Sequence, residues 1–368
     1  MARLGDYVKI RTGKLDANAA SENGRYPFFT CAVEPLKIDT YSYDCECVLV
    51  AGNGDLNVKY YDGKFDAYQR TYIIESLDTA VLTVPYLYCF LDKYVEALRQ
   101  QAIGGVIKYI KLGNLTEAEI PIPSITEQQK IIENLGKVNE LIALRKEQLA
   151  KLDRLVKSRF IELFGDPEHN EKAIPTLPMT ELCEIIDGDR GVNYPKQEEF
   201  SDNGFCLFLN AKNVTANGFS FENCMFITAE KDKLLRKGKL SRGDVVLTTR
   251  GTIGNLAFYD GAVPYEHIRI NSGMVILRMK RECITERFFI EQFKMQLASI
   301  KEKIASGSAQ PQLPISTMNK IVMLVPDVDL QHQFAAFVEQ TDKSKLAIQQ
   351  SLDKLELLKK SLMQENFG

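Results

Sequence analysis

Patterns that bind metals are scarce in this chain. Its three histidines, His169, His267 and His332, lie far apart, and none has a second His or Cys at ligand spacing. Its eight cysteines are spread irregularly, mostly inside apolar runs, and no Cys-x-x-Cys pair occurs. The pattern argues against a metal or redox site and indicates reduced, mostly buried thiols, as in a cytoplasmic protein.

Long apolar runs are missing as well. The N-terminal residues MARLGDYVKI have no apolar core of the kind that signal peptides carry. No stretch approaches the roughly 18 uninterrupted apolar residues that a membrane span needs. We therefore expect a cytoplasmic protein with no membrane partner.

Motifs of enzymes that act on DNA are also absent. The chain has no Asn-Pro-Pro or Asp-Pro-Pro run ending in Tyr or Phe, no Gly-x-Gly-x-x-Gly loop and no phosphate-binding loop with Gly-Lys-Ser/Thr. Glu-x-Lys occurs nowhere, and the one Asp-x-Lys, Asp62-Gly63-Lys64, lies between alternating apolar residues, where Asp-Gly predicts a hairpin turn. Its counterpart, Asp260-Gly261-Ala262, lacks the lysine. We expect no catalytic residue on this chain.

What the chain does contain is a duplication. An offset of 203 residues pairs Pro123 with Pro326, Gln128 with Gln331, and Phe164-Gly165 with Phe367-Gly368. Further upstream the offset drifts, so that Tyr61 matches Tyr259 at 198. The sequence therefore predicts two copies of one module, in which the front of each copy is the variable part.

Each copy ends in a long run with few helix breakers, Gly136 being the exception, after a candidate N-cap at Thr126 or Asp329. The first run, 127–164, would be about 57 Å long as a helix, more than one DNA turn of about 34 Å. Apolar residues at steps of four and three predict a coiled-coil seam, and differences between the two stripes favour pairing within the chain over two homodimer seams. The expected seam residues are Ile131, Leu135, Val138, Ile142, Leu149, Leu152, Val156, Phe334, Val338, Ile348, Leu352, Leu355 and Leu362.

In front of each long helix the pattern is rich in strands and includes one amphipathic helix, at 86–101 and at 286–304. This predicts an α+β fold of two tandem modules, each followed by a long helix, with the two helices paired within the chain. The predicted ranges are 1–124 and 172–327 for the modules and 125–171 and 328–368 for the helices.

The charge distribution neither clearly favours nor excludes binding to nucleic acid. The chain carries a net charge of −3, whereas a free-standing DNA-binding protein is usually basic. Residues 1–124 hold 13 basic and 16 acidic side chains, and residues 172–327 hold 20 and 18, so positive charge is local, as in the run from Lys231 to Arg242. That run is either a solvated helix face or a strip that contacts phosphates.

Polar and basic residues between glycines and aromatics are candidates for contact with base edges, because Arg, Asn and Gln make bidentate contacts to guanine and adenine. A single loop Arg or Asn is also commonly solvated or part of a turn. The candidates are Asn53, Gln69, Arg70, Lys108, Tyr109, Lys237, Arg250, Thr252, Asn255, His267, Arg269, Gln310 and Gln312.

The chain resembles the specificity subunits of type I restriction-modification systems over nearly its whole length. The resemblance is carried by the repeat, by the run from ITEQQK to ELFGDP and by the TTRGTIGN and GNGDLNVKYYDGKFDA segments. In that family two target-recognition domains of α+β fold, related by a pseudo-two-fold axis, each read half of a split DNA sequence, and two long helices pair antiparallel as a spacer. Here the resemblance gives these roles to 1–124, 172–327 and the two helices.

The resemblance also implies partners. Two modification subunits would supply S-adenosylmethionine and methylate adenine, and separate restriction subunits would use ATP and Mg²⁺ for translocation and cleavage of double-stranded DNA. No cofactor is expected on this chain. Two alternatives stay open: a self-contained restriction or modification enzyme, against which the missing motifs argue, and a coiled-coil adaptor without a nucleic-acid role, which the net charge favours.

Overall fold

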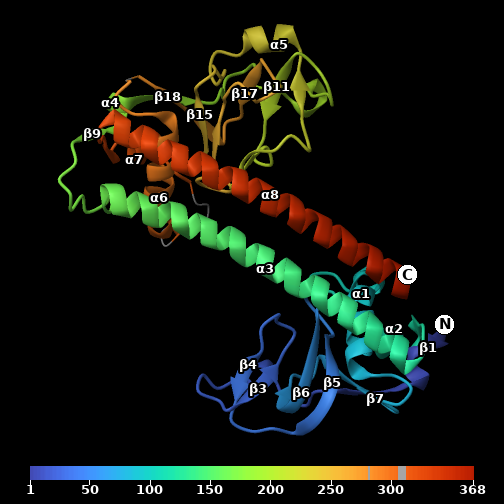
Figure 1. Cartoon of the computed structure of the whole chain (residues 1–368). Helices are drawn as coiled ribbons and strands as arrows, with labels where there is room; N and C mark the ends of the chain where they lie inside the picture. The colour runs from blue at the N-terminus through green and yellow to red at the C-terminus, as the bar shows by residue number, and fades with distance from the viewer. Residues whose placement is uncertain (281, 306–311) are drawn as a thin grey trace. The chain divides into compact units, whose positions relative to one another are not determined.

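The computed structural model describes residues 1–280, 282–305 and 312–368. The chain forms two compact units (Figure 1). Unit 1 consists of Met1–Gln148 and Ala347–Gly368, and unit 2 of Leu149–Leu346. Each unit thus combines one strand-rich module with one part of each long helix, so the helices are not separate domains.

Unit 1 is built on a six-stranded sheet. Only the β3–β6 pair is parallel, and all other neighbours are antiparallel. The order is β2 (Val8–Thr12), β7 (Thr71–Ser76), β5 (Tyr43–Ala51), β6 (Val58–Ala67), β3 (Tyr26–Phe29), β4 (Leu36–Ile38).

One helix, α1 (Val84–Gln101), covers this sheet. Its residues Tyr86, Leu87, Phe90 and Leu91 are all at most 1% exposed, in one core cluster with residues of the sheet. The remaining elements are β1 (Ala2–Arg3) paired with β8 (Glu119–Ile120), the short helix α2 (Leu112–Thr116), and the 3-10 turns η1 (Leu4–Asp6) and η2 (Ala17–Ala19).

Unit 2 divides its strands among several sheets. A four-stranded antiparallel sheet is ordered β10 (Cys183–Asp187), β18 (Met274–Met279), β15 (Val245–Thr248), β16 (Leu256–Phe258). A three-stranded sheet is ordered β14 (Phe226–Ile227), β11 (Cys206–Leu209), β17 (Ile268–Ile270). Two pairs complete the strands, β12 (Val214–Thr215) with β13 (Gly218–Phe219), and β19 (Val322–Leu324) with β9 (Thr176–Pro178). The helices of unit 2 other than the long ones are α4 (Met179–Leu182), the 3-10 turn η3 (Gln197–Glu199), α5 (Ala229–Leu234), α6 (Glu286–Ala305) and α7 (Ile315–Met318).

The two modules share a set of strands and one helix, which we call the frame. The order β2-β7-β5-β6 in unit 1 is repeated as β10-β18-β15-β16 in unit 2, α1 corresponds to α6, and the pair β1–β8 corresponds to β9–β19. The segments that differ are β3 and β4 in unit 1 and β11 to β14 with β17 in unit 2. The prediction of a duplicated α+β fold with a variable front is therefore confirmed.

The long helices are α3 (Ile125–Phe164) and α8 (Val328–Phe367), each of 40 residues. The N-caps predicted at Thr126 and Asp329 are wrong, because the capping residues lie two positions upstream of them. Ser124 donates to the Glu127 carboxylate through its N–H and its hydroxyl, at 3.0 and 2.7 Å, in a capping box. In the second copy the Asp327 carboxylate accepts the Asp329 N–H at 2.9 Å.

Within each unit α3 and α8 run side by side in opposite directions (Figure 1). In unit 1 Arg145 Nε donates to Ser351 Oγ at 3.2 Å, while Leu135 shares a core with Met363 and Phe367. In unit 2 Lys345 pairs with Asp153 at 2.6 Å, and the ring of Phe334 packs against those of Phe160 and Phe164. Antiparallel pairing of the two helices is thus observed at both ends.

None of the thirteen predicted seam residues is exposed: six are buried and seven are half-buried. Several of them, such as Leu135 and Phe334, are packed in the cores of the modules, so burial alone does not assign all thirteen to a seam between the helices. The buried ones are Leu135, Val138, Val156, Phe334, Val338 and Leu352, and the half-buried ones are Ile131, Ile142, Leu149, Leu152, Ile348, Leu355 and Leu362.

The hairpin predicted at Asp62-Gly63 is wrong. Both residues lie inside β6, where Asp62 pairs with Glu46 and Gly63 pairs with Cys45. Gly63 takes a φ of +131° within the strand, so the glycine serves an irregular strand and not a turn. The chain reverses between β5 and β6 at 52–57, and Asp260-Gly261 forms a turn that follows β16.

Candidate nucleic-acid interface

Two loops at the ends of corresponding strands are held in the same way in the two units. In unit 1 Asn53, just after β5, forms a β-bridge with Tyr109, and the Ile110 N–H donates to Gly52 O at 2.9 Å. In unit 2 Arg250, just after β15, forms a β-bridge with Gln312, and the Leu313 N–H donates to Thr249 O at 2.9 Å. The same backbone frame therefore presents Asn53 with Tyr109 in one unit and Arg250 with Gln312 in the other.

A third loop joins each bridge through the backbone. In unit 1 the Gly52 N–H donates to Arg70 O at 2.8 Å, and in unit 2 the Thr249 N–H donates to Gly273 O at 2.8 Å. Arg70 precedes β7 and Gly273 precedes β18, so these residues are also counterparts. Three loops thus meet at one edge of the frame in each unit.

A glycine marks the same edge in both units. A Cβ on Gly13, after β2, would lie 2.2 Å from Ala67 O, and a Cβ on Gly188, after β10, would lie 2.2 Å from Asn271 O. No side chain fits at either position, because the obstacle is backbone. The close approach brings the end of the first sheet strand to the three-loop edge.

Most of the candidates in unit 1 lie at this edge. The side chains of Arg70, Lys108 and Tyr109 are exposed, and Asn53 is half-buried. Lys108 O accepts the Gly54 N–H at 2.9 Å, which fixes the backbone beside Tyr109. The Gln69 side chain donates to the Asp16 carboxylate at 2.8 Å, so it is already engaged within the unit.

In unit 2 Arg250, Thr252, Lys237 and Gln312 are exposed, and Gln310 lies outside the described residues. Two candidates have internal roles. Asn255 donates its side-chain N–H to Val214 O at 2.9 Å, and the ring of His267 stacks on Phe205 with centroids 4.1 Å apart.

Arg269 is a correction. It is only 5% exposed, and its Nε donates to Asp232 Oδ1 at 2.6 Å, while its terminal nitrogens donate to Asp232 O and Lys237 O, both at 2.7 Å. Because all these donors are used inside unit 2, Arg269 cannot reach a base edge and is a structural residue. Its place in β17, between the buried Ile268 and Ile270, explains the burial.

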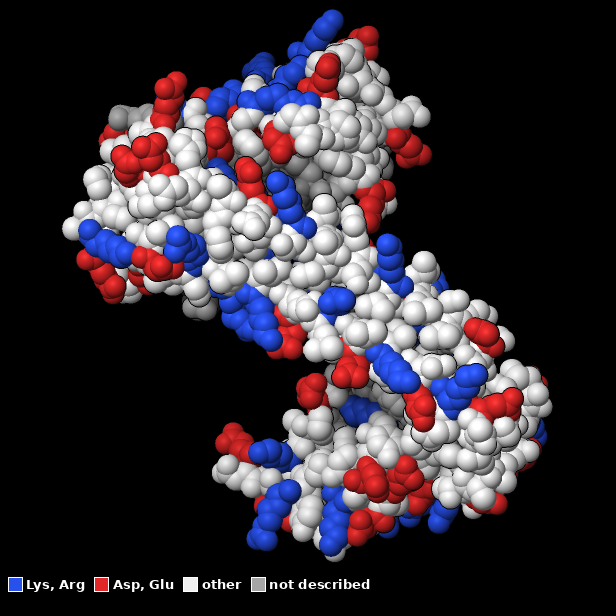
Figure 2. All heavy atoms as spheres, viewed as in Figure 1, with Lys and Arg blue, Asp and Glu red and all other residues white. Residues whose placement is uncertain are grey.

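The charge of Asp232 is stabilised by its two cationic partners. Burial alone would raise the pKa of Asp232, but the hydrogen bonds from Lys239 and Arg269 outweigh it and hold that pKa below its usual value. Over the face shown in Figure 2, basic and acidic side chains are interspersed on both units. Charge of one sign therefore does not single out a candidate surface on this face.

Sequence reasoning missed Arg190 and Ser272, whereas Arg236 lies in the run from Lys231 to Arg242 that it singled out. Arg190 donates to the Asp187 carboxylate at 3.1 Å and to Ser272 O at 3.2 Å, which places it beside the three-loop edge of unit 2. The available signal was the run Asp187-Gly188-Asp189-Arg190-Gly191 directly after an apolar strand, which is typical of a tight loop.

Among the described residues no group of three or more His, Cys, Asp or Glu side chains is arranged to hold a metal ion. None of the helices in the described ranges is long and apolar enough to cross a membrane. Burial raises the pKa values of the thiols of Cys89 to about 11 and of Cys183 and Cys206 to about 12. These three cysteines are therefore protonated and unreactive at neutral pH.

The repeated frame and the paired helices define a protein made of two copies of one α+β recognition module. The chain belongs to the family described as the type I restriction modification DNA specificity domain, which it matches twice, over residues 1–154 and 176–358. The predicted resemblance is thereby confirmed.

Similar proteins carry the corresponding names. The chain is 39% identical to the type I restriction enzyme EcoDI specificity subunit of Escherichia coli over 154 residues, 42% of this chain and 34% of that protein. It is 24% identical to the MjaIX specificity subunit of Methanocaldococcus jannaschii over 68% of this chain and 60% of that protein. The chain thus spans less than two thirds of the length of these two relatives. A putative type I specificity subunit of Mycoplasma genitalium is 23% identical over 96% of this chain and 89% of that protein.

Two solved structures share the fold. A type I restriction-modification S subunit from M. genitalium superposes with a TM-score of 0.61 at 19% identity, covering 100% of this chain and 95% of that one. A chain from a study of complex assembly and conformational transition in the type I system gives a TM-score of 0.55 at 16% identity, covering 100% and 96%.

Proposed function

We propose that this chain reads a bipartite, asymmetric sequence in double-stranded DNA, with unit 1 reading one half and unit 2 the other. The observation that carries the proposal is the pair of equivalent bridges, Asn53–Tyr109 and Arg250–Gln312. One backbone frame that presents different side chains at corresponding positions suits two related readers of different half-sites. Asn suits adenine and Arg suits guanine in the major groove.

The chain does no chemistry in this proposal. Two modification subunits bind S-adenosylmethionine and methylate adenine at the site that the chain selects, and restriction subunits use ATP and Mg²⁺ for translocation and cleavage. The specificity subunits among its relatives support this division of labour, and the location in the cytoplasm, where the host DNA lies, belongs to the same proposal.

The test is co-expression with the modification subunit encoded beside it, followed by mapping of methylated adenines on the host DNA. We expect a single bipartite motif that disappears when this chain is omitted. A competent modification subunit that purifies with this chain yet methylates no such motif would overturn the proposal and leave an adaptor without a nucleic-acid role.

A further inference from the structure

The loop after β10 in unit 2 is held by a buried carboxylate that is not among the candidate residues. Asp189 is 7% exposed and accepts the backbone N–H groups of Gly191 at 2.7 Å, Arg236 at 2.7 Å and Lys237 at 3.3 Å. It thereby fastens the loop after β10 to the turn after α5. A pocket of about 260 Å³ opens between the two segments and is lined by Asp189, Gly191, Val192, Asn193, Leu234 and Arg236.

The same turn is held from the other side. Arg269 donates to Lys237 O at 2.7 Å, and Arg269 is itself fixed by Asp232. The backbone of Lys237 is therefore tied through its N–H to one buried ionic group and through its C=O to another. A surface turn with two such anchors is pre-organised, so its side chains need little ordering when a ligand binds.

The turn is continuous with the three-loop edge of unit 2. Arg190 follows Asp189 directly and donates to Ser272 O at 3.2 Å. Ser272 is followed by Gly273, whose carbonyl accepts the N–H groups of Thr249 at 2.8 Å and Arg250 at 3.2 Å. A line of contacts thus leads from Lys237 through Asp189 and Arg190 to Arg250.

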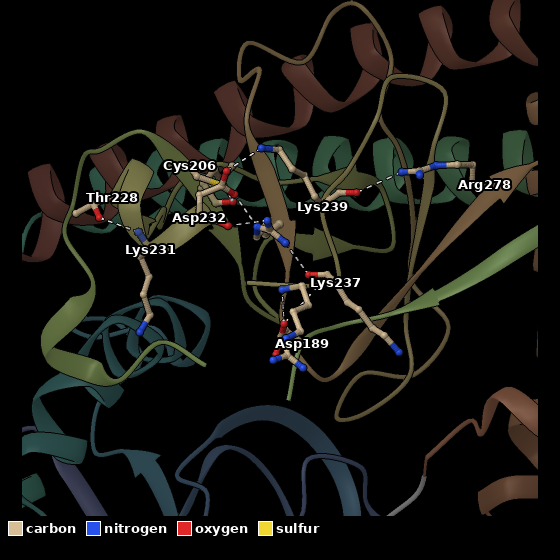
Figure 3. A network of polar contacts seen from close by, with 11 residues as sticks. Asp189, Cys206, Thr228, Lys231, Asp232, Lys237, Lys239 and Arg278 are labelled. Atoms are coloured by element: carbon tan, nitrogen blue, oxygen red, sulfur yellow. Dashed lines mark hydrogen bonds and ion pairs between the residues drawn. The ribbon is translucent and has the colours of Figure 1, made fainter. Parts of the chain in front are cut away.

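The cations on this line are open to a ligand. The side chains of Arg236, Lys237 and Arg250 are exposed, and within the described ranges no carboxylate lies at ion-pair distance from them. The nearby carboxylates of Asp189 and Asp232 are occupied by the bonds given above. In Figure 3 the side chain of Lys237 extends away from the network.

We propose that Arg236 and Lys237, which we call the basic strip, contact the phosphates of the half-site that unit 2 reads, and that Asp189 is the positioning residue for the strip. The inference rests on the proposed function and adds a division of labour: the basic strip holds the duplex, and Arg250 and Gln312 face the bases. Phosphate contacts fix register and carry no sequence information.

Unit 1 lacks this arrangement. Cys183 at the start of β10 corresponds to Val8 at the start of β2, an offset of 175 residues, so the counterpart of Asp189 is Lys14. A lysine cannot accept the three N–H groups that Asp189 gathers. The strip therefore acts on the half of the target read by unit 2 alone.

The experiment uses the complex of this chain with its modification subunit and two duplexes, one with the target and one with both half-sites scrambled. Dissociation constants are measured over a range of salt concentrations for wild type, for the double variant Arg236→Gln with Lys237→Gln, and for the control Lys320→Gln. Lys320 is an exposed cation of unit 2 away from the strip.

For the double variant we expect the slope of log K against log salt to fall by about 1.8, since each lost phosphate contact accounts for about 0.9. Binding to both duplexes should weaken by the same factor, the methylated motif should not change, and the control should match wild type. An unchanged slope, or a change in the motif itself, would overturn the inference. A wild-type complex that shows no salt-dependent DNA binding would instead overturn the proposed function.

Asp189→Ala separates positioning from charge. Removing a negative charge beside the strip should strengthen DNA binding if Asp189 acts only through its field, whereas loss of positioning should weaken it. We expect weaker binding with a reduced slope, together with faster hydrogen exchange at residues 235–238 in a variant that melts as a folded protein. Tighter binding, or exchange at 235–238 equal to wild type, would refute the positioning role.

Discussion

Gln128 and Gln331 are counterparts 203 residues apart, and both are fully buried at the start of a long helix. Gln128 donates to Val81 O at 2.7 Å and Pro123 O at 3.0 Å and accepts the Thr83 N–H at 3.0 Å. Gln331 donates to Cys283 O and Pro326 O, both at 2.9 Å, and accepts the Thr285 N–H at 2.8 Å. Each glutamine thus joins the long helix to the N-terminus of the module's own helix, α1 or α6.

We predict that Gln128→Leu and Gln331→Leu each destabilise one unit. The change leaves buried N–H and C=O groups without partners, at about 1–3 kcal/mol for each group. Hydrogen exchange should speed up at the start of α1 in the first variant and at the start of α6 in the second. Gln129→Leu, at an exposed neighbour, is the control. Equal effects of Gln128→Leu on α1 and α6 would contradict the prediction.

We predict that Asn53→Ala and Arg250→Ala alter different halves of the methylated motif. Each removes a side chain from one of the two equivalent bridges, and loss of a bidentate base contact costs about 1–3 kcal/mol of discrimination at one position. Methylation mapping with each variant in the complex is the measurement. If Arg250→Ala altered both halves equally, the modular interpretation would be wrong.

We predict that Arg269→Ala acts on folding and leaves the motif unchanged. The Asp232 carboxylate would be left buried with one of its two cations gone, and breaking such a pair costs about 3–5 kcal/mol. Thermal unfolding should show a large loss, with part of it recovered when Asp232→Asn is added. A variant that melts like wild type yet methylates a different motif would restore Arg269 as a base-reading residue.

We predict that Asp189 makes unit 2 sensitive to acid. Burial raises its pKa, but the N–H groups of Gly191, Arg236 and Lys237 outweigh burial and set the pKa below the usual value. The unfolded chain then binds more protons than the folded one as pH falls below about 4, so the stabilisation is full above that pH and is lost as pH falls through the lowered pKa. Acid unfolding of Asp189→Asn should depend less on pH in this window than that of wild type, whereas an identical dependence would count against the role.

Periodic features could be predicted from the sequence, and contacts between distant segments could not. The stripes along α3 and α8 and the offset of 203 follow from residue spacing alone, so both long helices were predicted, and only their N-caps were placed two residues too late. Arg269 looked like the other polar candidates of unit 2, because nothing local shows that Asp232, 37 residues earlier, buries it. The hairpin turn predicted at Asp62-Gly63 was wrong for a related reason. Hydrogen bonding of β6 to the distant strand β5 overrides the local preference of Asp-Gly for a turn.

The bridge between Asn53 and Tyr109, and that between Arg250 and Gln312, join residues more than 50 positions apart. The sequence offered these residues singly, as side-chain types suited to base edges, and could not say which of them meet. Asp189 and Arg190 were missed because a loop carboxylate that gathers N–H groups resembles any turn-forming aspartate.

The shared strands of the two units allow each unit to change separately in evolution. The strands β2-β7-β5-β6 and β10-β18-β15-β16 keep the same ladders, while the segments between β2 and β5 and between β10 and β15 differ in length and in the strands they form. A change within one of these segments leaves the ladders of the shared strands intact. Under the proposed function, lineages that exchange these segments independently accumulate targets as the product of the variants available to each unit, and not as their sum.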